Sequence, residues 1–213
     1  PKDEPKELLL PPKNKDCNRV TEYLFGRGID LSIIQDCIAD GTIFESSKYH
    51  NVVFIGKDES GTPKYAAYRG TIGSSFKGDA SGSDKRYSFA VPMTPGDSPT
   101  LCVFESAIDA LSYLTLLKQQ GRDWRKANTL SLGGISTEKG RGLPPPLSQY
   151  LKTAPHISRV VLCLDNDAPG RKAAAVLKEL LRGYEVIDRP PVRGKDYNDL
   201  LRYRRDAQRG EAR

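Results

Sequence analysis

The sequence RVVLCLDNDAPG, at Arg159–Gly170, carries the strongest structural signal in the chain. Its unbroken apolar run, Val160–Leu164, is typical of a strand buried on both faces, as in a parallel sheet. Asp165 and Asp167 follow directly, and residues two apart in an extended chain project to the same side. Two carboxylates held this close repel each other unless a cation or a proton relieves them. The stretch therefore predicts a charged site at the carboxyl end of a buried strand.

The region after Thr100 alternates between strand and helix patterns. Apolar runs predict four strands, and helical spacing predicts a segment between each pair of them. Strands separated by helices form a parallel sheet with right-handed crossovers. The fold class is therefore α/β, with a four-stranded parallel sheet flanked by helices. The expected strands are 101–104, 129–132, 160–164 and 184–187, and the expected helices are 107–120, 144–153 and 171–181.

The first half of the chain predicts a smaller α+β domain. Helical spacing at 18–26 and 30–39 indicates either a helix-turn-helix or an ordinary helical hairpin, and the hairpin is favoured because no recognition-helix chemistry stands out. Strand patterns follow at 51–56 and 64–70, and one more strand is expected at 87–91. The Gly/Ser-rich stretch at 71–86 indicates either a loop that approaches phosphates or a flexible hairpin end. The expected organisation is a linker at 1–16, a small domain at 17–95 and the α/β domain with a basic C-terminal helix at 96–213.

Composition is typical of a soluble globular protein. The chain has 213 residues, of which 38% are hydrophobic and 28% charged. No apolar run approaches the roughly 18–20 residues that span a bilayer, and the first residues do not resemble a signal peptide, so we expect no membrane association. Because the sequence begins without Met, we expect it to be a fragment of a larger protein.

Charge and cysteine content narrow the class. The net charge of +6 permits binding to phosphate backbones, and much of the excess lies in 189–213, which is either a solvated helix face or a nucleic-acid surface. The four cysteines form no CxxC pair and there are only two histidines, which argues against a zinc site. This cysteine usage suits a reducing compartment, so the expected location is cytoplasmic.

Acidic residues follow the expected strands at the edge where sites on open α/β sheets form. Glu105 ends the first strand, and Asp109 lies one helical turn later on the same face. Taken singly, each acid has an ordinary explanation as a cap, turn or surface residue, but together they favour a metal site. Oxygen ligands favour Mg²⁺ or Mn²⁺, and Glu105 is the candidate general acid or base. The predicted ligands are Asp109, Asp165, Asp167, Asp196 and Asp199.

These acids resemble the motif of a known family. VFESAIDALS at Val103–Ser112, followed by LCLDNDAPGRKA at Leu162–Ala173, is similar to the Toprim domain shared by DnaG-type primases, topoisomerases and several nucleases. The family motif is a strand-end Glu followed by a later Asp-x-Asp, and Asp109 matches a second acid of the primase branch. The resemblance implies a Toprim fold and Mg²⁺-dependent chemistry on nucleic acid. The matching motif residues are Glu105, Asp165 and Asp167.

Two other regions bear on the resemblance. GKDYNDLL at Gly194–Leu201 is similar to the primase GxDPDxL segment. Two positions differ, because Tyr197 replaces Pro and Asn198 replaces an Asp. The lost carboxylate would weaken the binding of a second metal ion unless Asp199 takes its place. The N-terminal half is similar to a small uncharacterised domain found before Toprim-like modules in proteins of plasmids and conjugative elements.

The leading hypothesis is primase-like nucleotidyl transfer on DNA of such an element. The implied partners are DNA or RNA, with single-stranded or template DNA foremost, together with nucleotides and other domains of a larger replication or mobilisation protein. The alternatives are a Toprim nuclease, using the same metal with water as nucleophile, and a non-catalytic nucleic-acid-binding module, which Asn198 favours. Basic residues can bridge to phosphates. The candidates for this contact are Arg69, Lys77, Lys85, Arg86 and Lys195.

Overall fold

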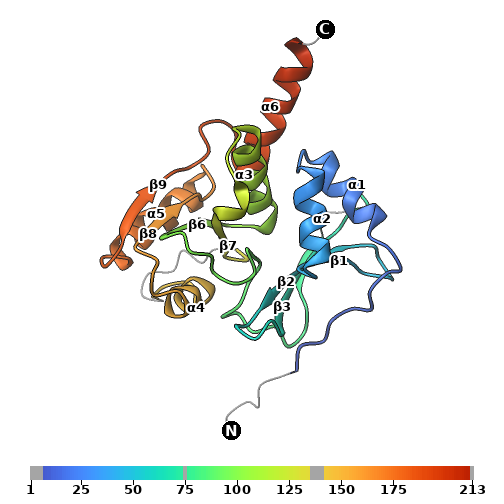
Figure 1. Ribbon diagram of the computed structural model, residues 1–213, viewed down its shortest axis with the longest axis horizontal. Helices are drawn as coiled ribbons and strands as arrows, with labels where there is room; N and C mark the ends of the chain where they lie inside the picture. The colour runs from blue at the N-terminus through green and yellow to red at the C-terminus, as the bar shows by residue number, and fades with distance from the viewer. Residues whose placement is uncertain (1–6, 74–75, 135–141, 212–213) are drawn as a thin grey trace.

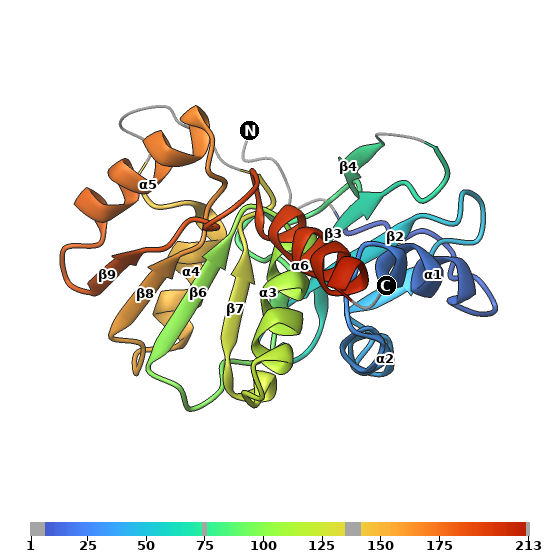
Figure 2. The same ribbon diagram turned by 90° about the horizontal axis from the view of Figure 1, so that it is seen from above.

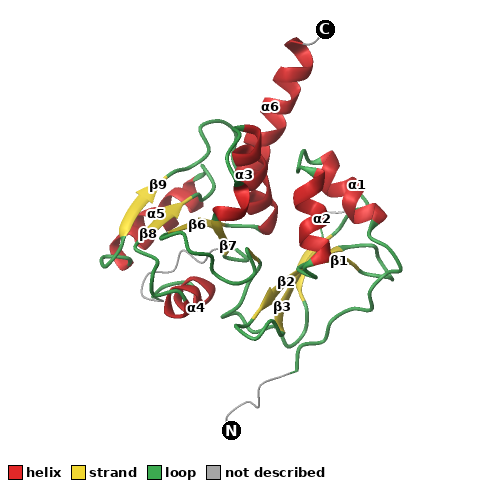
Figure 3. Ribbon diagram, viewed as in Figure 1, coloured by secondary structure: helices red, strands yellow, loops and turns green. Residues whose placement is uncertain are grey.

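The computed structural model describes residues 7–73, 76–134 and 142–211 (Figure 1). Two sheets organise this part of the chain, and helices lie against both (Figure 3). An antiparallel sheet belongs to the N-terminal half and a mostly parallel sheet to the C-terminal half, which confirms the predicted fold class. No helix of the described residues combines the length and apolar character needed to cross a bilayer.

The C-terminal sheet has the strand order β5-β7-β6-β8-β9. Four of its strands are parallel, as predicted. The fifth, β5 (Ala90–Val91), corrects the expectation of a strand inside the small domain, because it pairs antiparallel with β7 and extends the C-terminal sheet. The parallel strands are β6 (Thr100–Phe104), β7 (Asn128–Ser131), β8 (Arg159–Leu162) and β9 (Glu185–Asp188).

Alternation along the strands divides the core into two layers. Leu101 and Val103 face α4 and α5, whereas Cys102 and Phe104 face α3, α6 and the N-terminal helices. Each layer buries an apolar surface that water would otherwise cover, so the sheet is sandwiched over much of its area. The helices are α3 (Ala107–Gln119), α4 (Pro145–Thr153), α5 (Ala168–Leu180) and α6 (Tyr197–Glu211), with the short 3-10 helix η1 (Trp124–Lys126) before β7.

The N-terminal half contributes a four-stranded antiparallel sheet and two helices. Asp30 caps the second helix by accepting a hydrogen bond from the backbone nitrogen of Ser32 at 2.9 Å. This helix buries Ile33 and Ile34 in the core that α3 also enters, so we interpret the two helices as a core-forming pair. The elements are α1 (Asn18–Gly26), α2 (Leu31–Ala39), β1 (Ile43–Glu45), β2 (Val52–Lys57), β3 (Pro63–Arg69) and β4 (Lys77–Asp79).

Residues 7–16 correct the expectation of a linker. The backbone nitrogen of Leu9 donates to the carbonyl of Ser81 at 2.9 Å, and that of Asn14 donates to the carbonyl of Glu45 at 2.8 Å. Main-chain hydrogen bonds therefore hold this segment on the small sheet despite its proline and lysine content. Residues 1–6 of the expected linker, and residues 74–75 of the Gly/Ser-rich stretch, lie outside the described residues.

The strand order creates a crevice at one end of the sheet. β6 is followed in the chain by β7 on one side, whereas β8 pairs with β6 on the other side (Figure 2). The direction of winding thus reverses between β6 and β8, and ligand sites on open α/β sheets form outside the carboxyl ends of strands at such a point. Glu105 and Asp165 come just after these two strands.

Gly170 is required by close backbone packing at this crevice. A Cβ at this position would lie 2.2 Å from the carbonyl oxygen of Asp165 and 3.0 Å from Oε1 of Glu105. We expect Gly170→Ala to lower the free energy of unfolding by about 1–3 kcal/mol, because the first turn of α5 must move outward. Gly26, a helical glycine with open space around it, is the matched control, and Gly26→Ala should cost nothing. Urea denaturation of both variants measures this, and equal stability would contradict the packing.

Candidate functional site

A cleft of about 330 Å³ opens between the two halves of the molecule at the crevice. One wall comes from the ends of β6 and β8 and carries Glu105 and Asp165, with Lys195 beside them. The opposite wall comes from β3 and β4 and carries Arg69 and Lys77. The cleft therefore sets an acidic edge against basic side chains, and neither domain forms it alone.

Glu105 and Asp165 are in direct contact at the acidic edge. The backbone nitrogen of Asp165 donates to Oε1 of Glu105 at 3.1 Å, which fixes the Glu105 side chain across the end of β8. Burial raises the pKa of Glu105 to about 7, and the negative charge of Asp165 adds to the shift. Burial also raises the pKa of Asp165, an effect that Lys195 opposes. Glu105 can therefore both hold and release a proton near neutral pH.

Lys195 bridges the aspartate pair. Its Nζ lies 3.3 Å from Oδ2 of Asp165 and 3.2 Å from Oδ2 of Asp167. Asp167 also caps α5, because its Oδ1 accepts a hydrogen bond from the backbone nitrogen of Gly170 at 2.9 Å. That bond chiefly lowers the pKa of Asp167, with Lys195 acting in the same direction. The predicted repulsion is thus relieved by a cation that the chain itself supplies.

The acidic edge fits a divalent cation in donor chemistry. Carboxylate oxygens are the ligands that Mg²⁺ and Mn²⁺ prefer, and the Lys195 ammonium already sits where positive charge is favoured. Within the described ranges, however, no group of three or more His, Cys, Asp or Glu side chains has a geometry that could hold a metal ion. Ligation by Asp165 and Asp167 therefore requires the Lys195 ammonium to withdraw.

The other predicted ligands are engaged elsewhere. Asp109 is only 6% exposed; its Oδ2 accepts from the Ser106 hydroxyl at 2.5 Å and its Oδ1 from the backbone nitrogen of Asn198 at 3.2 Å. Burial, with help from the charge of Asp196, raises the pKa of Asp109 to about 7. Asp109 thus lies in the cleft wall but ties α6 to α3.

Asp196 and Asp199 serve the start of α6. Oδ1 of Asp196 accepts from the backbone nitrogen of Asp199 at 2.7 Å, which is the contact of an N-terminal cap. Oδ2 of Asp199 accepts from the backbone nitrogen of Lys195 at 3.1 Å, and Asp199 does not line the cleft. The structure brings Asp196 to the cleft wall and leaves Asp199 outside, so their metal roles remain predictions that the geometry does not favour.

The two departures from the primase segment have structural reasons. The Asn198 amide donates to the carbonyl of Arg27 and to the hydroxyl of Ser112, both at 3.0 Å, and a carboxylate could not donate these bonds. Tyr197 packs edge-on against the rings of Phe104 and Tyr113, with centroids 5.5 Å apart in each case. Both residues therefore hold α6 to the rest of the molecule.

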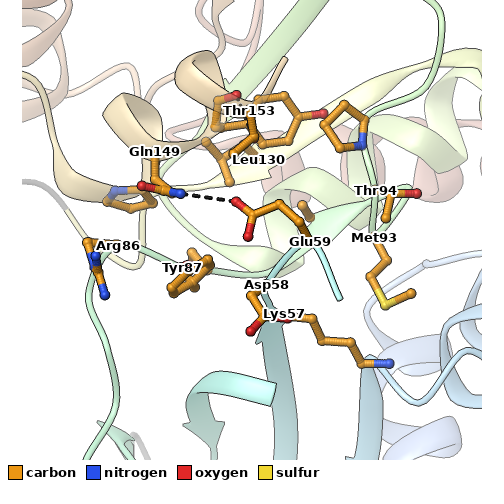
Figure 4. A pocket seen from close by; sticks show the side chains of 15 residues that line it. Lys57, Asp58, Glu59, Arg86, Tyr87, Met93, Thr94, Leu130, Gln149 and Thr153 are labelled. Atoms are coloured by element: carbon orange, nitrogen blue, oxygen red, sulfur yellow. Dashed lines mark hydrogen bonds between the residues drawn. The ribbon is translucent and has the colours of Figure 1, made fainter. Parts of the chain in front are cut away.

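The predicted basic residues divide into two groups. Arg69 and Lys77 line the cleft, whereas Lys85 is paired with Asp79 at its margin. Arg86 does not line the cleft and pairs with Asp84 at 2.6 Å, so its predicted contact with phosphates stays a prediction. It lines a different hollow of about 220 Å³ between the β2–β3 turn and α4 (Figure 4). Of the predicted cations of the small domain, the two that line the cleft are therefore Arg69 of β3 and Lys77 of β4.

The cleft residues that sequence reasoning missed include Arg27, Tyr65 and Tyr68. Tyr65 could have been found, because the period of two in β3 places it on the same face as Arg69. Its hydroxyl donates to Oδ1 of Asp79 at 2.6 Å. Arg27 gave no local signal; its Nε is buried without a hydrogen-bond partner among the described residues. Arg27 lines the cleft, but this nitrogen is enclosed by protein and does not reach the cleft surface.

Comparison with known proteins agrees with this geometry. The profile of the Toprim-like family matches residues 102–201. The C-terminal half of this chain is a Toprim-like domain. A family described as a protein of unknown function, DUF3991, matches residues 22–94 before it.

Two curated relatives are similar over most of the chain. A "65 kDa protein" of Zymomonas mobilis is 30% identical over 205 residues, covering 91% of this chain and 32% of that protein. An uncharacterised protein of Bacillus anthracis labelled pXO2-78 is 30% identical over 166 residues, covering 72% of this chain and 45% of that protein. The chain thus spans less than half the length of either relative.

Solved structures similar to the chain are primase cores. The primase fragment of the bacteriophage T7 primase-helicase protein has a TM-score of 0.61 at 19% identity, covering 88% of this chain and 72% of that one. The E. coli primase catalytic core has a TM-score of 0.56 at 16% identity, covering 89% of this chain and 70% of that one. At these identities the likeness is one of fold, and it spans both halves of the molecule.

Replacing Lys195 tests its place between the aspartates. We expect Lys195→Met to lower stability without metal, because the carboxylates lose their counter-charge, and to make Mn²⁺ raise the melting temperature more than in the parent protein. A tenfold gain in metal affinity adds about 1.4 kcal/mol of stabilisation at saturating metal. Lys172→Met, an exposed change on α5, is the control. An unchanged metal response in Lys195→Met would contradict the competition.

The raised pKa of Glu105 predicts a pH dependence. The native state keeps this proton up to about pH 7, whereas the ordinary value is 4.5, so between these values the native state binds more protons than the unfolded chain. The free energy of unfolding should then fall as pH rises through this window, and Glu105→Gln should flatten the slope. A ¹³C NMR titration of the carboxyl group measures the pKa directly. A midpoint near 4.5, or an unchanged slope, would contradict the burial effect.

Proposed function

We propose that the chain is a divalent-metal-dependent module of a nucleic-acid enzyme, with primase-like nucleotidyl transfer as its reaction. One observation supports this most directly: the strand-end acids Glu105 and Asp165 face the cations Arg69 and Lys77 across a single cleft. Nucleic acids and nucleotides carry phosphates that need both a metal site and basic side chains. The Toprim-like match supplies the chemical precedent.

In this proposal the acidic edge has two tasks. Asp165 and Asp167 hold Mg²⁺ or Mn²⁺ once the Lys195 ammonium has withdrawn, and the bound ion neutralises charge on the reacting phosphate. Glu105 acts as the general acid or base at Oε2, since its Oε1 accepts the hydrogen bond from Asp165. Its pKa of about 7 suits proton transfer near neutral pH.

The opposite wall positions the substrate. Arg69 and Lys77 contact phosphates, and the positive charge of Arg27, which also lines the cleft, attracts them. Tyr68, a partly exposed residue of the cleft wall, offers a ring on which a base can stack. Arg69 is held in place because its Nε donates to the Tyr23 hydroxyl at 3.3 Å. The substrate would therefore lie between the small domain and the Toprim-like domain.

The relatives support the choice of substrate and context. One similar structure is described as a DnaG primase catalytic domain bound to ssDNA, and another contains T7 primase domains bound to an RNA/DNA hybrid and dTTP. We therefore propose single-stranded template DNA and nucleotides as ligands. The pXO2 label of one relative supports a plasmid or conjugative element, and the greater length of the relatives supports further domains as partners. The buried, unpaired thiols of Cys37, Cys102 and Cys163 support a reducing, cytoplasmic location.

A single assay tests the proposal. The protein is incubated with labelled nucleotides, single-stranded DNA and Mg²⁺, Mn²⁺ or EDTA, and we expect metal-dependent oligonucleotide synthesis. Asp165→Asn with Asp167→Asn should reduce the rate about 100-fold or more, because several kcal/mol of charge stabilisation are lost. Asp97→Asn, an exposed change outside the cleft, is the matched acidic control.

The products separate the alternatives. Shortened DNA in place of synthesis would identify a nuclease that uses the same acids. A gel shift with neither reaction, unchanged by EDTA, would overturn the enzymatic proposal in favour of a binding module. Full synthesis by the double variant, with circular dichroism unchanged, would show that the site lies elsewhere.

A further inference from the structure

A second charged hollow lies on a face of the C-terminal sheet that the helices leave open. It has a volume of about 290 Å³ and is lined by parts of β6, β8 and β9, by α3 and by the segment after α3. Figure 2 shows α4 and α5 behind β8 and β9, while α3 and α6 lie toward β7 and leave the front of β8 and β9 without a helix. The hollow shares no lining residue with the acidic cleft, so it is a separate feature.

Positive charge dominates the rim of this arginine hollow, whose cations are Arg122, Lys126, Arg159 and Arg189. Two carboxylates are nearby. Glu185 pairs with Arg159 at 2.8 Å, and Oδ1 of Asp123 accepts from the backbone nitrogen of Arg125 at 3.2 Å.

Three of the rim cations lack a carboxylate partner. Within the described part of the chain, no Asp or Glu lies within ion-pair distance of Arg122, Lys126 or Arg189. Like charges placed around one hollow repel each other, and this arrangement is stabilised when an anion binds between them. The three cations come from separate places: the loop after α3, η1 and the loop after β9.

The floor of the arginine hollow is buried and largely apolar. Cys102 and Val161 belong to neighbouring strands, and Tyr113 closes the side toward α3. The pKa of Cys102 is lowered, chiefly by its hydrogen bond with Cys163 and also by the charges of Arg189 and Arg122. The positive charges of both guanidinium groups are therefore felt at the buried floor of the hollow, where water screens them less than in bulk solvent.

We propose that the arginine hollow binds a small phosphorylated ligand. Arg122, Lys126 and Arg189 contact the phosphate oxygens, since guanidinium groups match phosphate in charge and geometry. Val161 and Ile187 receive the organic part of the ligand. A hollow of limited volume, ringed by cations, suits a compact phosphate or nucleotide better than a continuous nucleic-acid backbone, which needs a track of charges. The proposal does not depend on the chemistry proposed for the cleft.

Calorimetric titration in EDTA tests the site without metal at the acidic edge. The probes are inorganic pyrophosphate and AMP, which separate recognition of phosphate alone from recognition of a nucleotide. We expect Arg122→Gln with Arg189→Gln to weaken binding about tenfold or more, because two charge-assisted contacts are lost. Arg202→Gln with Arg204→Gln removes two exposed charges of α6 and is the matched control. This control pair should not change the affinity.

Amide shifts on the unmodified protein provide an independent readout. Pyrophosphate should shift the ¹⁵N–¹H signals of Cys102 and Val161 and leave those of Glu105 and Asp165 in place. Equal weakening by the α6 control pair, shifts confined to the cleft, or no binding at millimolar pyrophosphate would each overturn the proposal. The double variant of Asp165 and Asp167 should still bind the probe, so loss of cleft chemistry and loss of this site are distinguishable.

Discussion

Electrostatic repulsion at the adjoining ends of β6 and β8 is the constraint on which the rest of the structure depends. The strand order brings Glu105 and Asp165 together, and burial makes their charges costly. Three contacts offset that cost. The backbone nitrogens of Asp165 and Gly170 donate hydrogen bonds to Glu105 and Asp167, respectively, and the Lys195 ammonium forms ion pairs with both aspartates. Because the donors come from the segment after β8, from α5 and from the loop before α6, the acidic edge is stable only when these elements are assembled.

The Lys195 contact differs from the other two because it is a flexible side chain. Two other hydrogen bonds hold the Lys195 backbone. The backbone nitrogen of Asn166 donates to the Lys195 carbonyl at 2.6 Å, and the backbone nitrogen of Lys195 donates to Oδ2 of Asp199 at 3.1 Å. The side chain is 56% exposed. Under the proposed function, an incoming cation would displace the ammonium without moving the loop or α6, because an exposed lysine loses little when it rotates into water. The framework of the acidic edge would stay fixed during this exchange.

Local pattern and strand topology together predicted one wall of the cleft. The apolar runs located β6 and β8, and the rule that sites form at carboxyl ends then singled out Glu105, Asp165 and Asp167. Sequence could not predict the need for an amide donor at Asn198, because its partners Arg27 and Ser112 lie far away along the chain. The short β5 was assigned to the wrong sheet for the same reason, since a two-residue strand is defined by its neighbour alone.

The two families matched along the sequence do not correspond to two independent cores. One apolar cluster runs from α1 and α2 through α3 to α6, and it includes Ile33 of the small domain and Leu201 of the Toprim-like domain. Polar contacts reinforce it: Lys118 pairs with Asp30 at 2.7 Å across the two halves. A shared core resists relative motion because separation would expose its apolar surface to water. The basic wall and the acidic edge are thus joined through this common core, and under the proposed function substrate selection would rest on the side chains of the cleft and not on domain closure.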